Sequence, residues 1–340
     1  MVKLINNYKH KYYLYFQFFL RYPSYKKYKN VIVSLYEQHT NKSKLISMPW
    51  IISIDPCNKC NLACPLCATG SGNSSAKKKH LSFEKFREYF DQIKNYIFFV
   101  RLYNWGEPFF NKDILKMIEY SHKNNVGVVV NSNFTVVSKD IIEQIVIQKL
   151  DYLILSIDGV TQEKYGVYRK KGIISKVFEN LEYLVAMKVK HQSKYPIIQW
   201  QFLQNGSNKS ELKLAYEKSK ELGINVFSVY SLSPFTIINQ KVNEKIYDEL
   251  GIDPNQKVSS ISNKKCHFLW NSLNIKPTGL VDPCCAIYND DDSFGDLNQH
   301  NIFEIWNNEK YLRGRNLFLT KIKQDNQAVI CDRCDLFTKS

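Results

Sequence analysis

Short hydrophobic segments alternate with amphipathic segments between Pro49 and about Leu232. The hydrophobic segments are rich in β-branched and aromatic residues, which favours β-strands. Six strands are predicted: Trp50–Asp55, Ile97–Tyr103, Gly127–Asn131, Tyr152–Asp158, Ile197–Leu203 and Val226–Leu232. Apolar residues at helical spacing predict five helices between them: Ser82–Lys94, Lys112–Lys123, Lys139–Ile147, Ile174–Lys188 and Lys209–Leu222.

A regular order of strand and helix predicts an α/β fold in which a parallel sheet is linked by right-handed crossovers. The continuous apolar run Val128–Val130 fits a sheet that is covered on both faces. Six strand–helix units are two short of a full eightfold barrel, so we expect an open, partial (β/α)6 TIM-like barrel. In such folds the functional site lies at the carboxyl ends of the strands.

The pattern changes after Asn243. Residues 244–265 are mostly polar and are predicted to form a linker, whereas residues 266–340 are rich in cysteine and have weak periodicity. The sequence therefore predicts an N-terminal arm (1–48), a barrel (49–243), the linker (244–265) and a small C-terminal module (266–340).

The composition is that of an ordinary globular protein, with 44% hydrophobic and 23% charged residues, which excludes a wholly disordered or fibrous chain. The net charge is +15, and the arm contributes +8 of it, from nine basic residues and the single acid Glu37. A nucleic-acid-binding protein usually spreads its basic residues over a folded face. We therefore expect no nucleic-acid partner.

The arm contains the longest apolar and aromatic stretch of the chain, Tyr12–Leu20. Nine residues are too few to span a bilayer, and no small-residue cleavage site of a signal peptide follows. This predicts a cytoplasmic location, where thiols stay reduced. The arm itself has two interpretations, an amphipathic helix that contacts a membrane surface or a helix packed on the barrel.

Nine cysteines in a reducing compartment indicate metal or redox chemistry rather than disulfides. Cys60, Cys64 and Cys67 have the spacing C-x3-C-x2-C, which begins five residues after the first predicted strand. Three thiolates on one tight loop can bind three irons of a [4Fe–4S] cube. The fourth iron then stays open to a substrate or cofactor, and an open position is typical of catalytic metal sites.

A zinc knuckle is the alternative interpretation of this loop. It would use Cys57 and Cys60 as one pair and Cys64 and Cys67 as the other. Only three residues separate these pairs, whereas zinc sites usually have about 12–20 residues between them. Cys57 is either a spare thiol or a fourth ligand that closes the cluster.

Three segments together resemble the radical S-adenosylmethionine (SAM) enzymes. They are the cysteine motif, the Gly106-Glu107-Pro108 turn after the second strand, and Ser156-Ile157-Asp158-Gly159 after the fourth. The C-terminal residues resemble the SPASM/twitch extension of the same superfamily. The resemblance runs from about Trp50 to Cys334 and says little about the substrate.

The resemblance implies that Cys60, Cys64 and Cys67 ligate a [4Fe–4S] cluster, whose open iron binds the amino and carboxylate groups of SAM. It implies that Glu107 accepts a hydrogen bond from the SAM amino group. The family usually has two glycines before this glutamate, whereas here Trp105 precedes Gly106.

Three further residues are implied to contact SAM. Ser132 precedes Asn133 and Phe134, at a place where the family usually has Thr-Asn-Gly. Ser156 is expected at the ribose or carboxylate of SAM, and Arg169 at its carboxylate. Each of Ser132, Ser156 and Arg169 has the alternative interpretation of an ordinary polar residue with no ligand.

A second set of cysteines follows the linker. Cys266 and Cys284 have the twitch spacing C-x12-G-x4-C, and Cys331 and Cys334 form a later C-x2-C. Turn residues predict a hairpin between Leu273–Ile275 and Leu280–Val281. The resemblance implies that the four cysteines fully ligate one auxiliary [4Fe–4S] cluster. A structural zinc site is the alternative.

Cys285 is adjacent to Cys284 and points the opposite way if the segment is extended. We therefore interpret Cys285 as a spare thiol.

The activity implied by the resemblance is reductive cleavage of SAM to a 5′-deoxyadenosyl radical that abstracts a substrate hydrogen. An electron donor such as flavodoxin or ferredoxin would supply the first electron. The auxiliary cluster would accept the electron of the substrate radical, so that the substrate, a peptide side chain or a small alcohol or amino sugar, is oxidised.

A different class of function is a non-catalytic zinc or iron–sulfur scaffold that binds partners through its basic arm. Glu107 argues against it, because a scaffold does not need an acid beside an open cluster.

Overall fold

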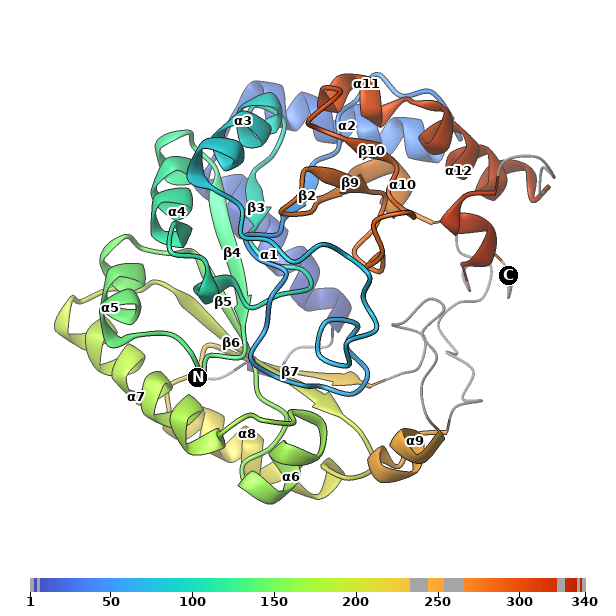
Figure 1. Cartoon of the computed structure of the whole chain (residues 1–340). Coiled ribbons are helices and arrows are strands. Elements are labelled where there is room, and N and C mark those ends of the chain that lie inside the picture. Colours follow the sequence, from blue (N-terminus) through green and yellow to red (C-terminus); the bar gives the residue numbers. More distant parts are fainter. Residues whose placement is uncertain are drawn as a thin grey trace.

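The computed structural model describes residues 3–4, 7–232, 244–253, 266–322, 328–334 and 337, with side chains from residue 13 onward. Its strands form one ten-stranded sheet in the order β1-β7-β6-β5-β4-β3-β2-β8-β9-β10 (Figure 1). The strands are β1 (Lys3–Leu4), β2 (Ile51–Ile54), β3 (Phe99–Arg101), β4 (Gly127–Ser132), β5 (Tyr152–Ser156), β6 (Ile197–Gln204), β7 (Val226–Ser231), β8 (Ser272–Ile275), β9 (Leu280–Asp282) and β10 (Gly295–Asp296).

The helices lie mostly outside the arc of strands (Figure 1). They are α1 (Asn7–Arg21), α2 (Tyr25–His39), α3 (Phe83–Ile93), α4 (Ile114–Lys123), α5 (Lys139–Ile147), α6 (Gln162–Tyr168), α7 (Ile174–Lys190), α8 (Leu212–Glu221), α9 (Glu244–Leu250), α10 (Phe268–Asn271), α11 (Ile302–Trp306) and α12 (Glu309–Thr320). Short 3-10 helices are η1 (Pro108–Phe110), η2 (Lys209–Glu211) and η4 (Ile330–Arg333).

The predicted fold class is confirmed. Strands β2 to β7 coincide with the six predicted strands, although β4 and β6 each end one residue later than predicted. They pair in parallel with their sequence neighbours. The five predicted helices correspond to α3, α4, α5, α7 and α8. Helix α3 begins where the sequence predicts, because the Ser82 hydroxyl accepts a hydrogen bond from the Lys85 amide (3.3 Å). Gly223 after α8 has φ +65°, as a helix end of this kind requires.

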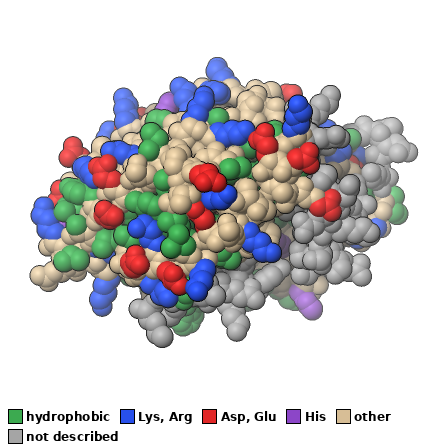
Figure 2. All heavy atoms as spheres, turned by 90° about the horizontal axis from the view of Figure 1, so that it is seen from below, with side chains coloured by type: hydrophobic (Ala, Val, Ile, Leu, Met, Phe, Trp, Pro, Cys, Tyr) green, Lys and Arg blue, Asp and Glu red, His purple; other side chains and the backbone are tan. Residues whose placement is uncertain are grey.

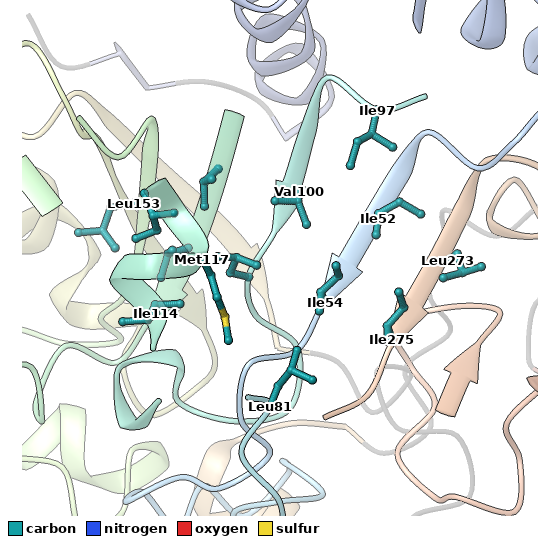
Figure 3. Packing of buried hydrophobic residues seen from close by; sticks show 14 of the residues in the cluster. Ile52, Ile54, Leu81, Ile97, Val100, Ile114, Met117, Leu153, Leu273 and Ile275 are labelled. Carbon is teal, nitrogen blue, oxygen red and sulfur yellow. The ribbon is translucent and has the colours of Figure 1, made fainter. Parts of the chain in front are cut away.

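The two faces of the sheet have different partners. The outer face carries the main core, in which Ile52, Ile54 and Val100 pack with Ile114 and Met117 of α4 (Figure 3). The residues that alternate with these positions point to the inner face. Near the amino ends of the strands the inner residues are apolar and belong to a second cluster: Ile51, Phe99, Val129, Tyr152 and Ile154.

Helix α1 covers this apolar part of the inner face (Figure 1). The Phe18 ring stacks on Phe99 with centroids 4.8 Å apart. A Cβ added to Gly127 would lie 2.3 Å from the Phe18 ring, so the glycine makes room for the helix. Of the two interpretations of the arm, the structure shows a helix packed on the barrel, although Phe16 and Leu20 of α1 stay exposed.

No helix among the described residues is long and apolar enough to cross a membrane. On the face seen in Figure 2, Lys and Arg side chains are interspersed with Asp and Glu among the described residues.

The C-terminal strands extend the sheet of the barrel. Strand β8 pairs in parallel with β2, from Ile51 opposite Ser272 to Ile54 opposite Ile275. The predicted hairpin is confirmed, because β8 and β9 pair antiparallel. The second cysteine set therefore starts beside the strand that leads into the C-x3-C-x2-C loop.

Candidate functional site

Cys60, Cys64 and Cys67 lie on one loop after β2. The Cys67 amide donates to the Cys64 carbonyl (3.1 Å), and the Leu62 amide donates to the Cys60 sulfur (3.4 Å). Cys67 contributes to raising the pKa of Cys60, and both Cys60 and Cys67 contribute to raising that of Cys64. The three thiols are therefore treated as one group. The loop is tied to the segment after α6 by a hydrogen bond from the Ala63 amide to the Lys170 carbonyl (2.9 Å).

The chemistry of this group suits an iron–sulfur cluster. Three thiols on one loop can each bind a separate iron of a [4Fe–4S] cube. Burial raises the pKa of Cys60 to about 11 and that of Cys64 to about 12. These thiols stay protonated at neutral pH until a metal displaces the proton.

Cys57 precedes this group and has contacts of its own. Its sulfur accepts a hydrogen bond from the Lys59 amide (3.2 Å), and its backbone forms a bridge with His80. Burial raises the pKa of Cys57 to about 11. This arrangement favours the spare-thiol interpretation of Cys57.

The Gly-Glu-Pro turn packs directly against the start of the cysteine loop. A Cβ added to Gly106 would lie 1.7 Å from the Cys57 carbonyl oxygen, so only glycine fits there. The next amide, that of Glu107, donates to the Lys59 carbonyl (2.8 Å). The preceding Trp105 does not obstruct this contact, because its indole donates to the Ile287 carbonyl (2.8 Å) of the C-terminal segment.

The Glu107 carboxylate is buried, with 2% of the residue exposed. It accepts hydrogen bonds from the Ser132 hydroxyl (2.7 Å), the Asn133 amide (2.8 Å) and the Phe109 amide (3.2 Å). Burial outweighs these bonds and raises the pKa of Glu107 to about 7. A buried carboxylate of this kind is stabilised by a cationic donor such as an ammonium group.

Ser132 reaches the site through Glu107. Its hydroxyl donates to the glutamate and also accepts from the Phe134 amide (2.8 Å). Phe134 has φ +60°, so the turn keeps its left-handed conformation without the usual glycine. The fully buried Phe134 ring packs on Phe109 and holds this conformation.

Asn133 is a site residue that the sequence interpretation did not select. Its amide nitrogen Nδ2 lies 3.7 Å from the Cys60 sulfur and donates to the Asn61 side chain (3.0 Å). The Asn133 backbone also donates to Glu107. The sequence did contain a signal for Asn133. It directly follows β4, after Ser132 and before Phe134, which stands where the family usually has glycine.

The last two predicted residues follow one another along the chain: Ser156 ends β5, and Arg169 comes directly after α6. The Ser156 hydroxyl donates to the Asn131 side chain (2.9 Å) on the inner face. Arg169 forms an ion pair with the buried Asp158, and its Nη1 lies 4.0 Å from the Cys64 sulfur. The structure therefore brings Arg169 to the cysteine loop together with Glu107 and Ser132.

The second cysteine set surrounds a cavity of about 80 Å³. Its lining is almost wholly apolar apart from the thiols of Cys266, Cys284, Cys285, Cys331 and Cys334. Burial raises the pKa of Cys266 to about 12 and raises those of Cys284 and Cys331 further above the ordinary thiol value. All nine cysteines of the chain are free thiols in the structure. A dry site lined by thiols suits a metal or an iron–sulfur cluster.

Two family models match the chain in the same two places. Residues 266–335 match an iron-sulfur cluster-binding domain, the SPASM domain. Residues 54–198, which include the cysteine loop and the Gly-Glu-Pro turn, match the radical SAM superfamily. The chain belongs to the radical SAM superfamily. The resemblance predicted from the motifs is thereby confirmed.

Named relatives and solved structures agree with this membership. The chain is 24% identical to the AdoMet-dependent heme synthase of Methanosarcina barkeri over 190 residues. These residues make up 56% of this chain and 52% of the relative. The chain thus spans about half the length of that relative. Streptococcus suis SuiB bound to S-adenosylmethionine superposes with a TM-score of 0.61 at 15% identity, covering 88% of this chain and 73% of SuiB. The structure of anSMEcpe with bound AdoMet gives a TM-score of 0.56 at 16% identity, covering 86% of this chain and 96% of anSMEcpe.

Membership supplies the cofactors, which are SAM and [4Fe–4S] clusters. The two groups of thiols fit clusters of this kind, one on a loop beside a buried acid and one around an apolar cavity.

Proposed function

We propose that this radical SAM protein is an enzyme that cleaves SAM reductively and abstracts a hydrogen atom from a substrate. The observation that carries the proposal is the assembly of Cys60, Cys64 and Cys67 with Glu107 and Arg169 at the carboxyl ends of the strands. A cluster with one open iron and bound SAM supplies the radical that removes the hydrogen. The net reaction is an oxidation or modification of the substrate.

The residues of the chain bind and orient SAM in this proposal. Cys60, Cys64 and Cys67 hold the cluster, and Glu107 accepts from the SAM ammonium group. Ser132 acts by orienting the Glu107 carboxylate, to which its hydroxyl donates (2.7 Å). Arg169 pairs with the SAM carboxylate. Its Nε contacts Asp158, and the other N–H groups of the guanidinium can donate to the SAM carboxylate.

Ser156 is proposed at the SAM ribose or carboxylate. Its hydroxyl lies at the end of β5 and already donates to Asn131 on the inner face. A hydroxyl can still accept hydrogen bonds while it donates one.

Cys266, Cys284, Cys331 and Cys334 are proposed to hold an auxiliary [4Fe–4S] cluster that accepts the electron of the substrate radical. Four cysteine ligands leave no open iron, which suits electron transfer rather than substrate binding. Flavodoxin or ferredoxin is the proposed source of the electron that starts the reaction. We also propose the division into a barrel (49–243), a linker (244–265) and an auxiliary module (266–340).

The substrate is proposed to be a peptide side chain or a small alcohol or amino sugar. Support for a peptide comes from SuiB, a protein of similar fold that was solved bound to the precursor peptide SuiA. We infer a cytoplasmic location from the nine free thiols, since oxidising compartments favour disulfides.

Anaerobic reconstitution with an iron count and an assay for 5′-deoxyadenosine tests the proposal. We expect about eight irons per chain, four for each [4Fe–4S] cluster, and formation of 5′-deoxyadenosine from SAM and a reductant. Cys57→Ala is expected to keep both clusters and the activity. A protein that binds iron or zinc but forms no 5′-deoxyadenosine would instead support the scaffold function.

A further inference from the structure

The inner face of the sheet becomes polar beyond the part that α1 covers. On each strand the residues that alternate with the outer core point to this face, and most of those beyond the apolar cluster are hydrophilic, with Leu203 at the end of β6 as an exception. The hydrophilic residues are Arg101 on β3, Asn131 on β4, Ser156 on β5, Gln199 and Gln201 on β6, and Ser228 and Tyr230 on β7. In parallel barrels this end of the strands is where substrates bind.

Arg101 is the one cation among these residues, and it is half-buried. No carboxylate of the described residues forms an ion pair with it, whereas Arg21 pairs with Asp151 and Arg169 pairs with Asp158. The two longest segments outside the described residues, 233–243 and 254–265, contain no Asp or Glu in their sequence.

The contacts that Arg101 does make cannot neutralise its charge. Its Nη2 lies 3.5 Å from the hydroxyl of Tyr15, at the outer limit of a hydrogen bond, and its guanidinium lies 5.7 Å from the centre of the Phe99 ring. Arg315, which is fully buried, shows the contrast, because three backbone carbonyls accept hydrogen bonds from it. A guanidinium that is partly removed from water and lacks such acceptors is stabilised by an anion.

Besides Tyr15, two further tyrosines interact with this cation. Arg101 acts electrostatically on Tyr103 and on Tyr230, and the latter is hydrogen-bonded with Gln199 and Ser228. Burial lowers the pKa of Arg101, but Tyr103, Tyr15 and Cys285 outweigh it, so the guanidinium stays charged.

The loop that follows Arg101 contacts the auxiliary segment. The indole of Trp105, four residues after Arg101, donates to the carbonyl of Ile287 (2.8 Å), and Ile287 lines the cavity of the second cysteine set. Arg101 therefore lies where the inner face of the barrel meets the proposed auxiliary cluster. A substrate radical that passes its electron to that cluster has to form nearby.

We propose that Arg101 binds an anionic group of the substrate, a carboxylate or a phosphate, with Tyr103 and Tyr230 contacting the polar atoms beside it. This inference rests on the proposed function, because it takes the inner face as the place where the substrate is held. The planar guanidinium matches two oxygens of either anion. Among the proposed substrate classes, Arg101 then favours a substrate with an anionic group. Such a substrate is an acidic peptide side chain or terminus, or a phosphorylated alcohol or sugar.

The experiment measures anion binding by the full-length, cluster-loaded protein. Its unfolding temperature is recorded in increasing sodium phosphate or sodium acetate, with sodium chloride at equal ionic strength as the reference. Arg101→Gln removes the charge, Arg101→Lys keeps the charge but loses the planar donor pair, and Arg87→Gln is the matched control on the exposed face of α3. The phosphate and acetate series distinguish the two anions.

We expect a saturable rise in unfolding temperature for the wild type and Arg87→Gln in at least one anion. Arg101→Gln should lose the saturable part, and Arg101→Lys should need at least about tenfold more anion, as the loss of one charge-assisted hydrogen bond implies. A merely structural role of Arg101 beside Tyr15 would lower the unfolding temperature of the variants without changing its dependence on the anion concentration.

An unchanged anion dependence in both Arg101 variants, or no saturable effect in the wild type, would overturn the inference. If Arg101→Gln does not fold, Arg101→Lys decides alone.

The outcome is separate from that of the proposed function, because anion binding is measured without radical chemistry. A wild type that cleaves SAM but shows no Arg101-dependent anion effect refutes only this inference. A wild type that binds the anion but never cleaves SAM refutes only the proposed function.

Discussion

Glu107 shows how one residue joins three parts of the site. Its carboxylate accepts from the Ser132 hydroxyl and from the Asn133 and Phe109 amides, while its own amide is bound to the cysteine loop at Lys59. The residue is thereby fixed before SAM binds. Preorganisation of this kind lowers the cost of binding a ligand.

Glu107→Gln is expected to weaken SAM binding about 10–100-fold. The change keeps the shape but removes the negative charge, and a hydrogen bond to a charged group contributes about 1.5–3 kcal/mol. The dissociation constant of SAM is measured by equilibrium dialysis on the reconstituted protein. Glu88→Gln on the exposed face of α3 is the control. Equal SAM affinity in Glu107→Gln and the wild type would show that Glu107 does not contact the ammonium group.

Arg169→Gln is expected to destabilise the fold by about 3–5 kcal/mol, because it leaves the buried Asp158 without its ion-pair partner. Adding Asp158→Asn removes the unpaired charge and should recover part of the loss. Urea unfolding of the metal-free, reduced protein gives the free energies of the wild type, the single variants Arg169→Gln and Asp158→Asn, and the double variant. Additive losses in the double variant would contradict the coupling between the two residues.

At the scale of elements, α1 belongs to the core of the barrel. Its inner residues pack against strands β2 to β5, and Gly127 leaves space for the Phe18 ring. The helix fills the apolar end of the inner face, and the polar residues lie beyond it.

Phe18→Ala is therefore expected to lower the free energy of unfolding by about 3–5 kcal/mol, the usual cost of removing a buried aromatic ring. Phe16→Ala, two residues earlier on the exposed side of α1, should change it by less than about 0.5 kcal/mol. Denaturant unfolding followed by circular dichroism measures both. Similar losses in the two variants would show that α1 is not packed as described.

Gly106→Ala is expected to displace the cysteine loop, since its Cβ would overlap the Cys57 carbonyl. Iron bound at the first cluster should fall, with the second cluster retained. Gly166→Ala is the control, because the nearest atom to its added Cβ is the Gln162 side-chain nitrogen at 3.2 Å, and no backbone atom outside α6 lies closer. A full complement of iron in Gly106→Ala would contradict the packing of the turn.

The sequence predicts those elements whose local pattern is strong. The apolar runs of β2 to β7 and the helices between them are buried in regular order, so their periodicity is clear. The sequence interpretation missed α6, which is only seven residues long. It also missed the parallel pairing of β8 with β2, because strands so distant in sequence carry no local signal of their pairing.

The site follows the same rule. Cys60, Cys64 and Cys67 were predictable because one loop carries all three, whereas Asn133 depends on a turn that Phe134 holds without glycine. Arg101 had a signal that went unused, a single charge within the apolar run Phe98–Leu102. Its lack of an acidic partner is visible only in three dimensions.

At the scale of the whole molecule, one sheet carries both groups of cysteines. The first group follows β2, and the segment that contains β8, the neighbour of β2, supplies the second. Within the described residues the two cysteine groups have no side chain in common. Substitutions can therefore remove one cysteine group and leave the other intact.

The most direct test of the account compares the two groups under one assay, formation of 5′-deoxyadenosine from SAM by the anaerobically reconstituted protein. Cys60→Ala is expected to abolish the formation of 5′-deoxyadenosine and to retain the auxiliary cluster. Cys331→Ala with Cys334→Ala is expected to keep it, provided that a thermal melt shows a folded barrel, since metal ligation contributes to the folding of a small module. SAM cleavage at the wild-type rate by Cys60→Ala, or its loss in the folded double variant, would contradict the assignment of the radical chemistry to the Cys60, Cys64 and Cys67 loop.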